Sequence, residues 1–130
     1  MNVRSETKLS PDLKFDNRFV SELPADPESS NELRQVHGAC YSEVQPAKVS
    51  APKLVAYSRE MAESLGLSIA YCESEEFARV FAGNQTLPGM QPYAMCYGGH
   101  QFGNWAGQLG DGRAINLGEI VNSQNERWAL

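Results

Sequence analysis

Residues 97–118 read YGGHQFGNWAGQLGDGRAINLG, and they decide how the chain is interpreted because they concentrate its glycines. This stretch holds seven of the 11 glycines, namely Gly98, Gly99, Gly103, Gly107, Gly110, Gly112 and Gly118. Glycine loses more backbone freedom on folding than any other residue. A cluster this dense therefore predicts backbone conformations or close approaches that a side chain would prevent.

Glycine-rich turns often hold phosphates, because main-chain amides converge on the anion, so nucleotide binding is the first hypothesis. A P-loop requires GxxxxGK followed by Ser or Thr. The stretch offers Gly107, Gly112 and Arg113 but has Ala114 where the magnesium-binding hydroxyl belongs. A dinucleotide-binding GxGxxG motif needs a third glycine where this chain has Ile115. Both motifs also lead into a helix, whereas the following residues alternate as a strand does, so both are excluded.

A kinase-type glycine loop, which joins two antiparallel strands and covers the phosphates, fits the spacing best. Gly110 and Gly112 predict a tight turn ahead of a strand, and Arg113 would add a planar, permanently charged fork for phosphate oxygens. The candidate nucleotide-binding residues are therefore Gly110, Gly112 and Arg113. A single GxG also occurs in purely structural hairpin turns, which is an alternative of about equal weight.

Five residues in or near this stretch are further candidates for a ligand or structural role. His100 either contacts a ligand or bonds a loop carbonyl, and Asp111 suits a turn position that tolerates a left-handed backbone. Phe102 and Trp105 are expected to anchor the glycine-rich stretch against the core. The sequence does not decide whether Glu119 faces water or a ligand. The roles of His100, Asp111 and Glu119 stay open.

Hydrophobic periodicity predicts an α+β fold in which helices pack on a small antiparallel sheet. The expected elements are a helical face over 15–24, a strand over 38–46, helices over 50–66 and 74–81, and a hairpin formed by 113–121 and 127–130. Ser50 and Ser74 are placed as helix caps, because a serine oxygen at that position accepts a first-turn N–H. Residues 24–35 are expected to form a surface loop.

Composition bounds the class of protein. The chain has 130 residues, 42% of them hydrophobic and 21% charged, which is ordinary for a soluble globular domain. Its net charge of −5 provides no basic patch for nucleic acid, so nucleic-acid binding is not expected. No apolar run approaches the length of a membrane span, and the N-terminus has no apolar signal core. A cytoplasmic protein without a membrane partner is expected.

Three cysteines are scattered along the chain, at Cys40, Cys72 and Cys96. Their odd number and wide spacing favour reduced thiols over a disulfide framework or a structural zinc site.

The motif HQFGNWAGQLGDGRA at 100–114 resembles the N-terminal part of the selenoprotein O family, whose bacterial members are also called YdiU-type proteins. FDNRF at 15–19 and YSEVQP at 41–46 extend the resemblance over most of the chain from Phe15 onward. The motif is too long for chance similarity.

The resemblance implies a protein kinase-like fold that acts as a protein adenylyltransferase. Members of this family bind ATP in an orientation flipped relative to kinases and move AMP to Ser, Thr or Tyr hydroxyls of proteins. The family's GDGR motif contacts the nucleotide phosphates, and it corresponds here to Gly110, Gly112 and Arg113.

The same resemblance implies that much of the enzyme lies outside these residues. The family's phosphate-binding lysine, its catalytic aspartate and its magnesium ligands follow further along the chain. The expected organisation is a flexible N-terminus over 1–14 and an incomplete, truncated kinase-like domain over 15–130, inactive alone and weak in its affinity for ATP. The alternative is a non-catalytic interaction module with a structural glycine-rich hairpin.

Overall fold

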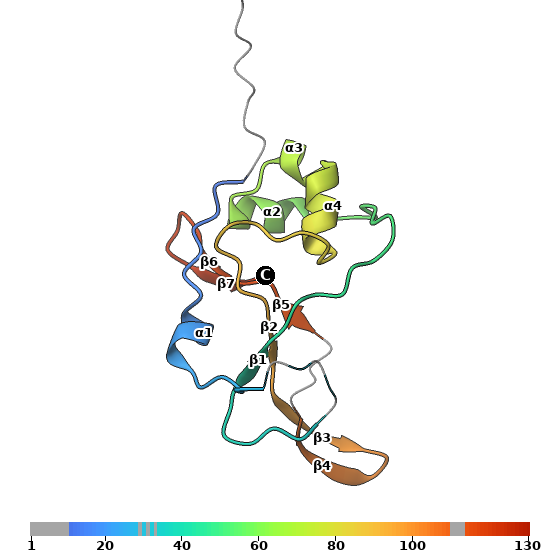
Figure 1. The fold of residues 1–130 in the computed structure, drawn as a ribbon. Coiled ribbons are helices and arrows are strands. Elements are labelled where there is room, and N and C mark those ends of the chain that lie inside the picture. Colours follow the sequence, from blue (N-terminus) through green and yellow to red (C-terminus); the bar gives the residue numbers. More distant parts are fainter. Residues whose placement is uncertain (1–10, 29, 31, 33, 110–113) are drawn as a thin grey trace, which may run out of the picture.

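The computed structural model describes residues 11–28, 30, 32, 34–109 and 114–130, which form short helices and small antiparallel sheets (Figure 1). The helices are α1 Arg18–Glu22, α2 Arg59–Leu65, α3 Ile69–Cys72 and α4 Glu75–Phe81. The strands are β1 Tyr41–Glu43, β2 Tyr93–Met95, β3 Tyr97–Gln101, β4 Asn104–Leu109, β5 Ile115–Asn116, β6 Glu119–Val121 and β7 Arg127–Ala129. The predicted α+β class is confirmed.

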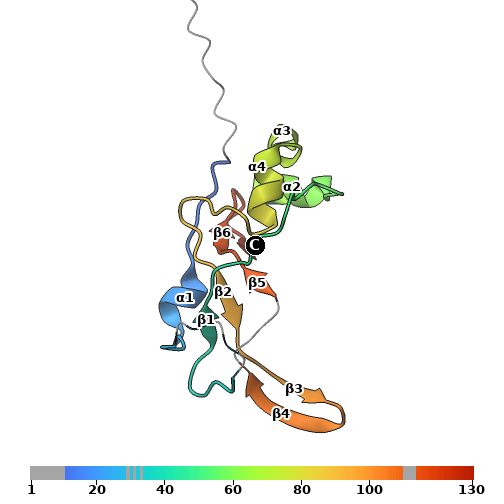
Figure 2. The ribbon, with the colours of Figure 1, turned by 45° about the vertical axis from the view of Figure 1, so that its right-hand side comes forward.

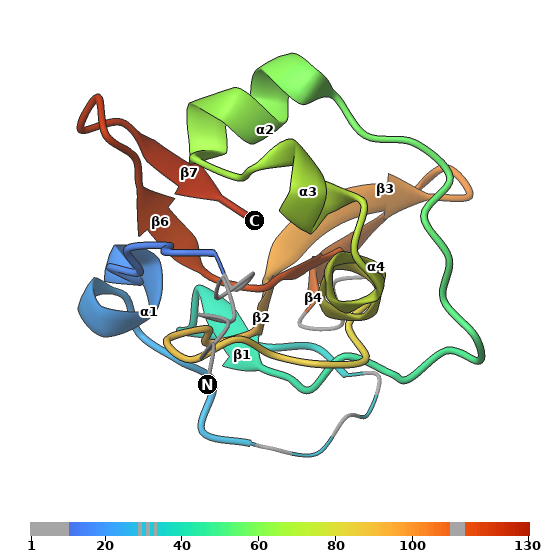
Figure 3. The same cartoon turned by 90° about the horizontal axis from the view of Figure 1, so that it is seen from above.

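The elements are arranged along one long axis. Helices α2, α3 and α4 gather at one end, the hairpin β3–β4 projects from the other, and the sheet β1–β2–β5 lies between them (Figures 1 and 2). Seen from above, the hairpin β6–β7 lies between α1 and α2 (Figure 3). Two hydrogen bonds fix it there, from Asn122 Nδ2 to the Ser64 carbonyl at 2.9 Å and from the Asp16 N–H to the Glu119 carbonyl at 2.9 Å.

Strand β2 is the centre of the main sheet and is antiparallel to both neighbours. Tyr93 and Tyr41 lie on one face of this sheet and are 1% and 3% exposed. Phe19 from α1 stacks on Tyr93 with ring centroids 5.0 Å apart and lies 5.9 Å from the Tyr41 ring. Apolar residues at alternate strand positions thus close a core against α1, as strand periodicity requires.

A serine caps each helix of the α2–α4 group. In each case the serine Oγ accepts the backbone N–H three residues later, in the pairs Ser58–Met61, Ser68–Tyr71 and Ser74–Phe77. These bonds satisfy donors that the first turn of a helix leaves unpaired. The predicted helix over 74–81 and its cap are confirmed. The four-residue helix α3 was not predicted, because it is too short to show periodicity.

The predicted helix over 50–66 is wrong in its first half. Helix α2 begins only at Arg59, after the Ser58 cap, and ends at Gly66 with φ 78°. Leu54 and Val55, which had suggested the apolar helical face, lie in irregular chain, and Val55 is 98% exposed. Ser58, a polar residue inside the predicted helix, is therefore the start signal of the observed one.

Mutation can distinguish the predicted cap residue, Ser50, from the observed one, Ser58. Ser58→Ala is expected to lower the free energy of unfolding by about 1 kcal/mol, because the Met61 N–H loses its acceptor. Ser50→Ala is the matched control and is expected to change little, since it lies outside the helix. Urea denaturation measures both. An equal or larger loss at Ser50 would contradict the observed helix start.

Helices α2–α4 enclose a small core of Ala62, Leu67, Tyr71 and Cys72. Tyr71 is 1% exposed, and its hydroxyl has no hydrogen-bond partner within the described part of the chain. Burial first, and then the nearby Glu76 carboxylate, raise the pKa of Tyr71 to about 12. Glu76 acts on the phenol electrostatically, but no hydrogen bond of acceptable geometry joins them. The phenol is neutral and unsatisfied, which costs stability.

Two tyrosine-to-phenylalanine changes should therefore have opposite signs. Tyr71→Phe is expected to raise the free energy of unfolding by about 1 kcal/mol, because it removes an unpaired buried hydroxyl. Tyr41→Phe is expected to lower it by about 1 kcal/mol, because the Tyr41 hydroxyl donates to the Val20 carbonyl at 2.6 Å. Thermal and urea denaturation of both variants measure the difference. Destabilisation by Tyr71→Phe would show that its hydroxyl has a partner.

The glycine-rich stretch forms the hairpin β3–β4, which sequence analysis did not predict. The pair Gln101↔Asn104 closes a two-residue turn in which Phe102 and Gly103 both have positive φ, 51° and 79°. At Gly98 an added Cβ would lie 2.6 Å from the Trp105 ring, so that ring would have to shift. Part of the close approach that the glycines suggested is therefore the contact between Gly98 and the Trp105 ring within the hairpin.

Phe102 and Trp105 do not anchor this stretch to the core, and that expectation is wrong. Phe102 lies at the hairpin tip and is fully exposed, and Trp105 is 62% exposed. Trp105 instead packs across the hairpin on Gly98 and meets the His100 ring edge-on at 5.2 Å. A two-stranded hairpin that projects from the body leaves its aromatic residues without a core to cover them.

The predicted C-terminal hairpin is confirmed as β6–β7, with Ile120 opposite Trp128. The long strand expected before it is divided into β5 and β6 by Leu117 and Gly118. These two residues bond the last residue instead, from the Leu117 N–H to the Leu130 carbonyl at 2.7 Å and from the Leu130 N–H to the Gly118 carbonyl at 2.9 Å. The alternation of residues over 113–121 that predicted one strand thus spans two strands of different sheets, and nothing in the sequence marks the boundary between them.

Residues 1–10 lie outside the described part of the chain, so the flexible N-terminus stays a prediction. Leu13 packs against the core of α2–α4, and the Lys14 carbonyl accepts the Val121 N–H at 2.9 Å. The chain is therefore held to the body from residue 13 onward. No helix in the described ranges combines the length and apolar content that a bilayer crossing demands.

Candidate functional site

The candidate nucleotide-binding residues Gly110, Gly112 and Arg113, together with Asp111, lie outside the described residues. The structure does describe the strands that precede and follow these four residues in the chain. Strand β4 ends at Leu109 immediately before the segment, and β5 begins at Ile115 just after it. Segment 110–113 therefore connects the projecting hairpin to the central sheet.

The two strands that flank the segment do not pair with each other, which corrects the prediction of a loop closing one antiparallel pair. Strand β4 pairs with β3, whereas β5 pairs with β2. The earlier turn at Phe102 and Gly103 already gives β4 a partner. Strand β5 then takes the free edge of β2, where Ala94 faces Ile115. The strands before and after residues 110–113 therefore belong to two different sheets.

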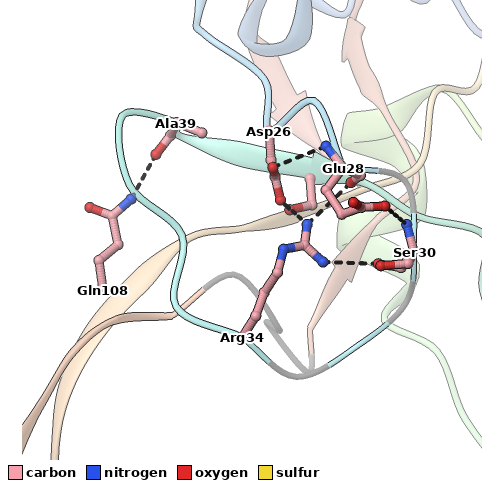
Figure 4. A network of polar contacts seen from close by, with 7 residues as sticks. Asp26, Glu28, Ser30, Arg34, Ala39 and Gln108 are labelled. Carbon is pink, nitrogen blue, oxygen red and sulfur yellow. Dashed lines mark hydrogen bonds and ion pairs between the residues drawn. The ribbon is translucent and has the colours of Figure 1, made fainter.

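The end of β4 is held by the irregular chain of residues 34–39. Gln35 forms a bridge with Leu109, and the Val36 N–H donates to the Gln108 carbonyl at 3.1 Å. In return, Gln108 Nε2 donates to the Ala39 carbonyl at 2.7 Å (Figure 4). The loop predicted only as a surface connection therefore positions the strand that leads into the candidate site. No periodicity or motif marked these residues, because their partners lie about 70 residues away in the chain.

An ion pair stabilises this loop. The Asp26 carboxylate is only 7% exposed and bonds the Arg34 guanidinium, the Glu28 N–H at 3.1 Å and the Ser42 hydroxyl at 3.1 Å (Figure 4). Burial opposes ionisation of Asp26, but the bonds from Glu28, Arg34 and Ser42 outweigh it and lower its pKa. Arg34 also donates to the Glu28 and Ser30 carbonyls at 3.1 and 3.0 Å. The Arg34 guanidinium is thus bonded to acceptors within the loop and stabilises the loop conformation.

Glu119, whose role the sequence left open, is a structural residue. It is 9% exposed, and its carboxylate accepts the Phe19 N–H at 2.6 Å, in the first turn of α1. The Asn17 side chain completes the link by accepting the Glu119 N–H at 3.0 Å and donating to the Gly89 carbonyl at 2.6 Å. A carboxylate at a helix start accepts hydrogen bonds from backbone N–H groups that have no partner within the helix, and it interacts favourably with the helix dipole. Glu119 therefore joins α1 to β6.

His100 lies in β3 and is exposed, with its ring against Trp105. All three cysteines are free thiols, as predicted, and Cys72 is fully buried. Within the described ranges, no three His, Cys, Asp or Glu side chains come together as metal ligands. The magnesium ligands implied by the resemblance stay a prediction for another part of the protein.

Comparison with known proteins shows similarity over nearly the whole chain. The family model described as protein adenylyltransferase SelO matches residues 26–130. Relatives named protein nucleotidyltransferase YdiU are 64% identical over 118 residues in Methylobacillus flagellatus and 62% identical over 122 residues in Aromatoleum aromaticum. Another, from Rhodopirellula baltica, is 60% identical over 119 residues.

These alignments cover 91–92% of this chain but only 22–23% of each relative. The chain thus spans just under a quarter of the length of the relatives it matches. The family match includes the motif at 100–114, the loop that holds β4 and the sheet that receives β5. The chain belongs to the protein adenylyltransferase SelO family.

Proposed function

We propose that this chain is the N-terminal part of a protein adenylyltransferase that transfers AMP from ATP to Ser, Thr or Tyr hydroxyls of proteins. The observation that carries the proposal is the family match over residues 26–130, which includes the GDGR motif. The names of the relatives, protein nucleotidyltransferase, support the same class of reaction. The mixed helix and antiparallel-sheet fold is compatible with the N-terminal part of a kinase-like domain.

Gly110, Gly112 and Arg113 are proposed to bind the phosphates of ATP. Glycine lets main-chain N–H groups approach phosphate oxygens, and a guanidinium makes two parallel hydrogen bonds to them. Such donors stabilise the charge that develops on the phosphates during transfer. ATP supplies the adenylyl group, and magnesium is proposed to be held by residues outside this chain. The described flanks are compatible with this role, because the strands before and after the segment belong to sheets.

The 130-residue chain by itself is proposed to lack transferase activity and to bind ATP weakly, because it supplies one side of a nucleotide site. The complete protein is therefore the material for the test. Incubation with ATP labelled in the α-phosphate is expected to transfer label to protein, whereas label in the γ-phosphate is not. Transfer of the γ-label would instead indicate a kinase.

A second candidate function is a non-catalytic interaction module. It is favoured by one observation, the exposed aromatic residues Phe102 and Trp105 on a hairpin in which Gly98 and Gly103 have structural roles. The labelling experiment separates the two candidates, because the module would incorporate neither label. Phe102→Ala would then weaken partner binding, whereas an adenylyltransferase would keep its phosphate chemistry without this side chain.

A further inference from the structure

Cys40 and Cys96 are brought together at the end of the β1–β2 ladder, although 55 residues separate them in the chain. The register Tyr41↔Met95, continued by one residue, places Cys40 directly opposite Cys96. The Cys96 N–H donates to the Cys40 carbonyl at 2.9 Å, which confirms this pairing. Directly opposite residues of antiparallel strands project from the same face of the sheet, so the two thiols are neighbours.

The backbone spacing of such a pair suits a disulfide. Opposite residues in a hydrogen-bonded antiparallel pair have Cα atoms about 5.5 Å apart, and disulfides most often join Cα atoms about 5.5–6 Å apart. Cβ atoms of such pairs are about 4.5–5.5 Å apart, whereas a disulfide needs about 3.8 Å. The sheet must therefore tighten slightly, which makes the resulting bond strained and easily reduced.

The Cys40–Cys96 pair lies at the end of the β1–β2 ladder and makes only one of the two hydrogen bonds usual for such a pair. The Cys40 N–H does not complete the second bond to Cys96 but donates to the Pro24 carbonyl at 2.8 Å. Both thiols are partly exposed, and both residues line one surface pocket of about 340 Å³ together with Gln108 and Met95. A small oxidant therefore has access to the pair.

We propose that Cys40 and Cys96 form a reversible disulfide when the protein meets hydrogen peroxide. One sulfur attacks the peroxide O–O bond, becomes a sulfenic acid and releases a first water. The other sulfur then attacks the sulfenic sulfur, the S–S bond forms, and a second water leaves. Two thiols are oxidised and one peroxide is reduced to two waters. A small dithiol reverses the reaction by thiol–disulfide exchange.

Both residues are free thiols in the structure. Burial raises the pKa of the Cys96 thiol, although Gln108 and Arg34 act in the opposite direction. The bond would connect Cys40, directly before β1, to Cys96, directly before β3. It would therefore lie at the base of the hairpin β3–β4, and β4 is the strand that precedes segment 110–113. This inference depends on the sheet register and not on the proposed transferase activity.

Peptide mapping of the complete protein tests the pair directly, because trypsin places each cysteine in a different peptide. Cleavage after Lys and Arg gives peptides 35–48, 60–79 and 80–113, which contain Cys40, Cys72 and Cys96 in turn. After peroxide treatment and blocking of free thiols, we expect 35–48 linked to 80–113, with loss of the link on reduction. Cys72, which is fully buried in another core, is the internal control and should stay a thiol.

Serine variants give the second arm of the test. Cys40→Ser and Cys96→Ser should each abolish the link, and Cys72→Ser should leave it unchanged. Oxidation of Cys40 and Cys96 to separate sulfinic acids, with no linked peptide, would overturn the proposal. So would a link that includes Cys72, because it would mean that the β1–β2 register does not bring the reacting thiols together.

Discussion

Replacing Arg113 by alanine is expected to lower adenylyl transfer by the complete protein about 100- to 1,000-fold, the usual effect of removing one positioned donor from a transition-state charge. The guanidinium carries a permanent charge and a planar donor pair that no neighbour in GDGR replaces. The loss should be mainly in kcat, because the interaction strengthens as charge develops on the phosphates. Transfer of α-labelled AMP to protein, measured at several ATP concentrations, separates kcat from KM.

Arg79→Ala is the matched control, because it removes the same side chain from the exposed surface of α4, where it pairs with Glu75 at 3.6 Å. It should leave transfer within about twofold of the original protein, in line with the small energies of exposed ion pairs. Arg113→Lys should recover only part of the activity, since an ammonium lacks the two-pronged geometry. An Arg113→Ala variant with unchanged transfer would remove Arg113 from the site.

Replacing Tyr93 by alanine is expected to lower the free energy of unfolding by about 3–5 kcal/mol, the range for deleting a buried aromatic side chain. Tyr93 is 1% exposed in the central strand and packs on Phe19 and Tyr41 with centroids 5.0 and 5.7 Å away. The change would leave a cavity between α1 and the sheet. Small domains have only about 5–15 kcal/mol of stability, so urea denaturation should show a large shift of the midpoint.

Phe102→Ala is the control for Tyr93→Ala, because it deletes an aromatic ring from the fully exposed hairpin tip. Its effect on the free energy of unfolding is expected to stay within about 0.5 kcal/mol. A large loss at Phe102 with a small one at Tyr93 would mean that the hairpin, and not the β1–β2–β5 sheet, holds the core. Strand β2 also positions β5, so Tyr93→Ala should loosen the chain that follows Arg113.

Local signals predicted part of the fold correctly. Helix α4 was predictable because Ser74 and the apolar stripe that follows are both contained in eight residues. Helix α2 was misplaced because Ser50 and Ser58 offer the same capping chemistry, and only the bond from the Met61 N–H shows which is used. Hairpin β6–β7 was predictable because a polar turn separates two apolar runs. Hairpin β3–β4 was not, because Phe102 is a rare choice for a positive-φ turn.

The candidate site was likewise predictable only in part. The GDGR motif and the family were identified from consecutive residues, and the family match confirms the membership. The surroundings of the motif were not predictable, because Gln35 and Val36 reach β4 through backbone contacts that any residue type can make. The Gln108 side chain adds a bond to Ala39, which lies 69 residues away in the chain. The structural role of Glu119 was hidden for a similar reason, since its partner Phe19 lies 100 residues away.

By itself the sequence determined the α+β class, the family and the Ser74 cap of α4, whose chemistry acts within a few residues. Only the tertiary structure decided that the strands before and after segment 110–113 belong to different sheets, that Asp26 and Arg34 bind each other, and that Cys40 faces Cys96. The physical reason is that capping and turn formation depend on neighbours along the chain. Strand pairing instead depends on which free edges meet when the chain collapses, and the same backbone groups are present at every residue.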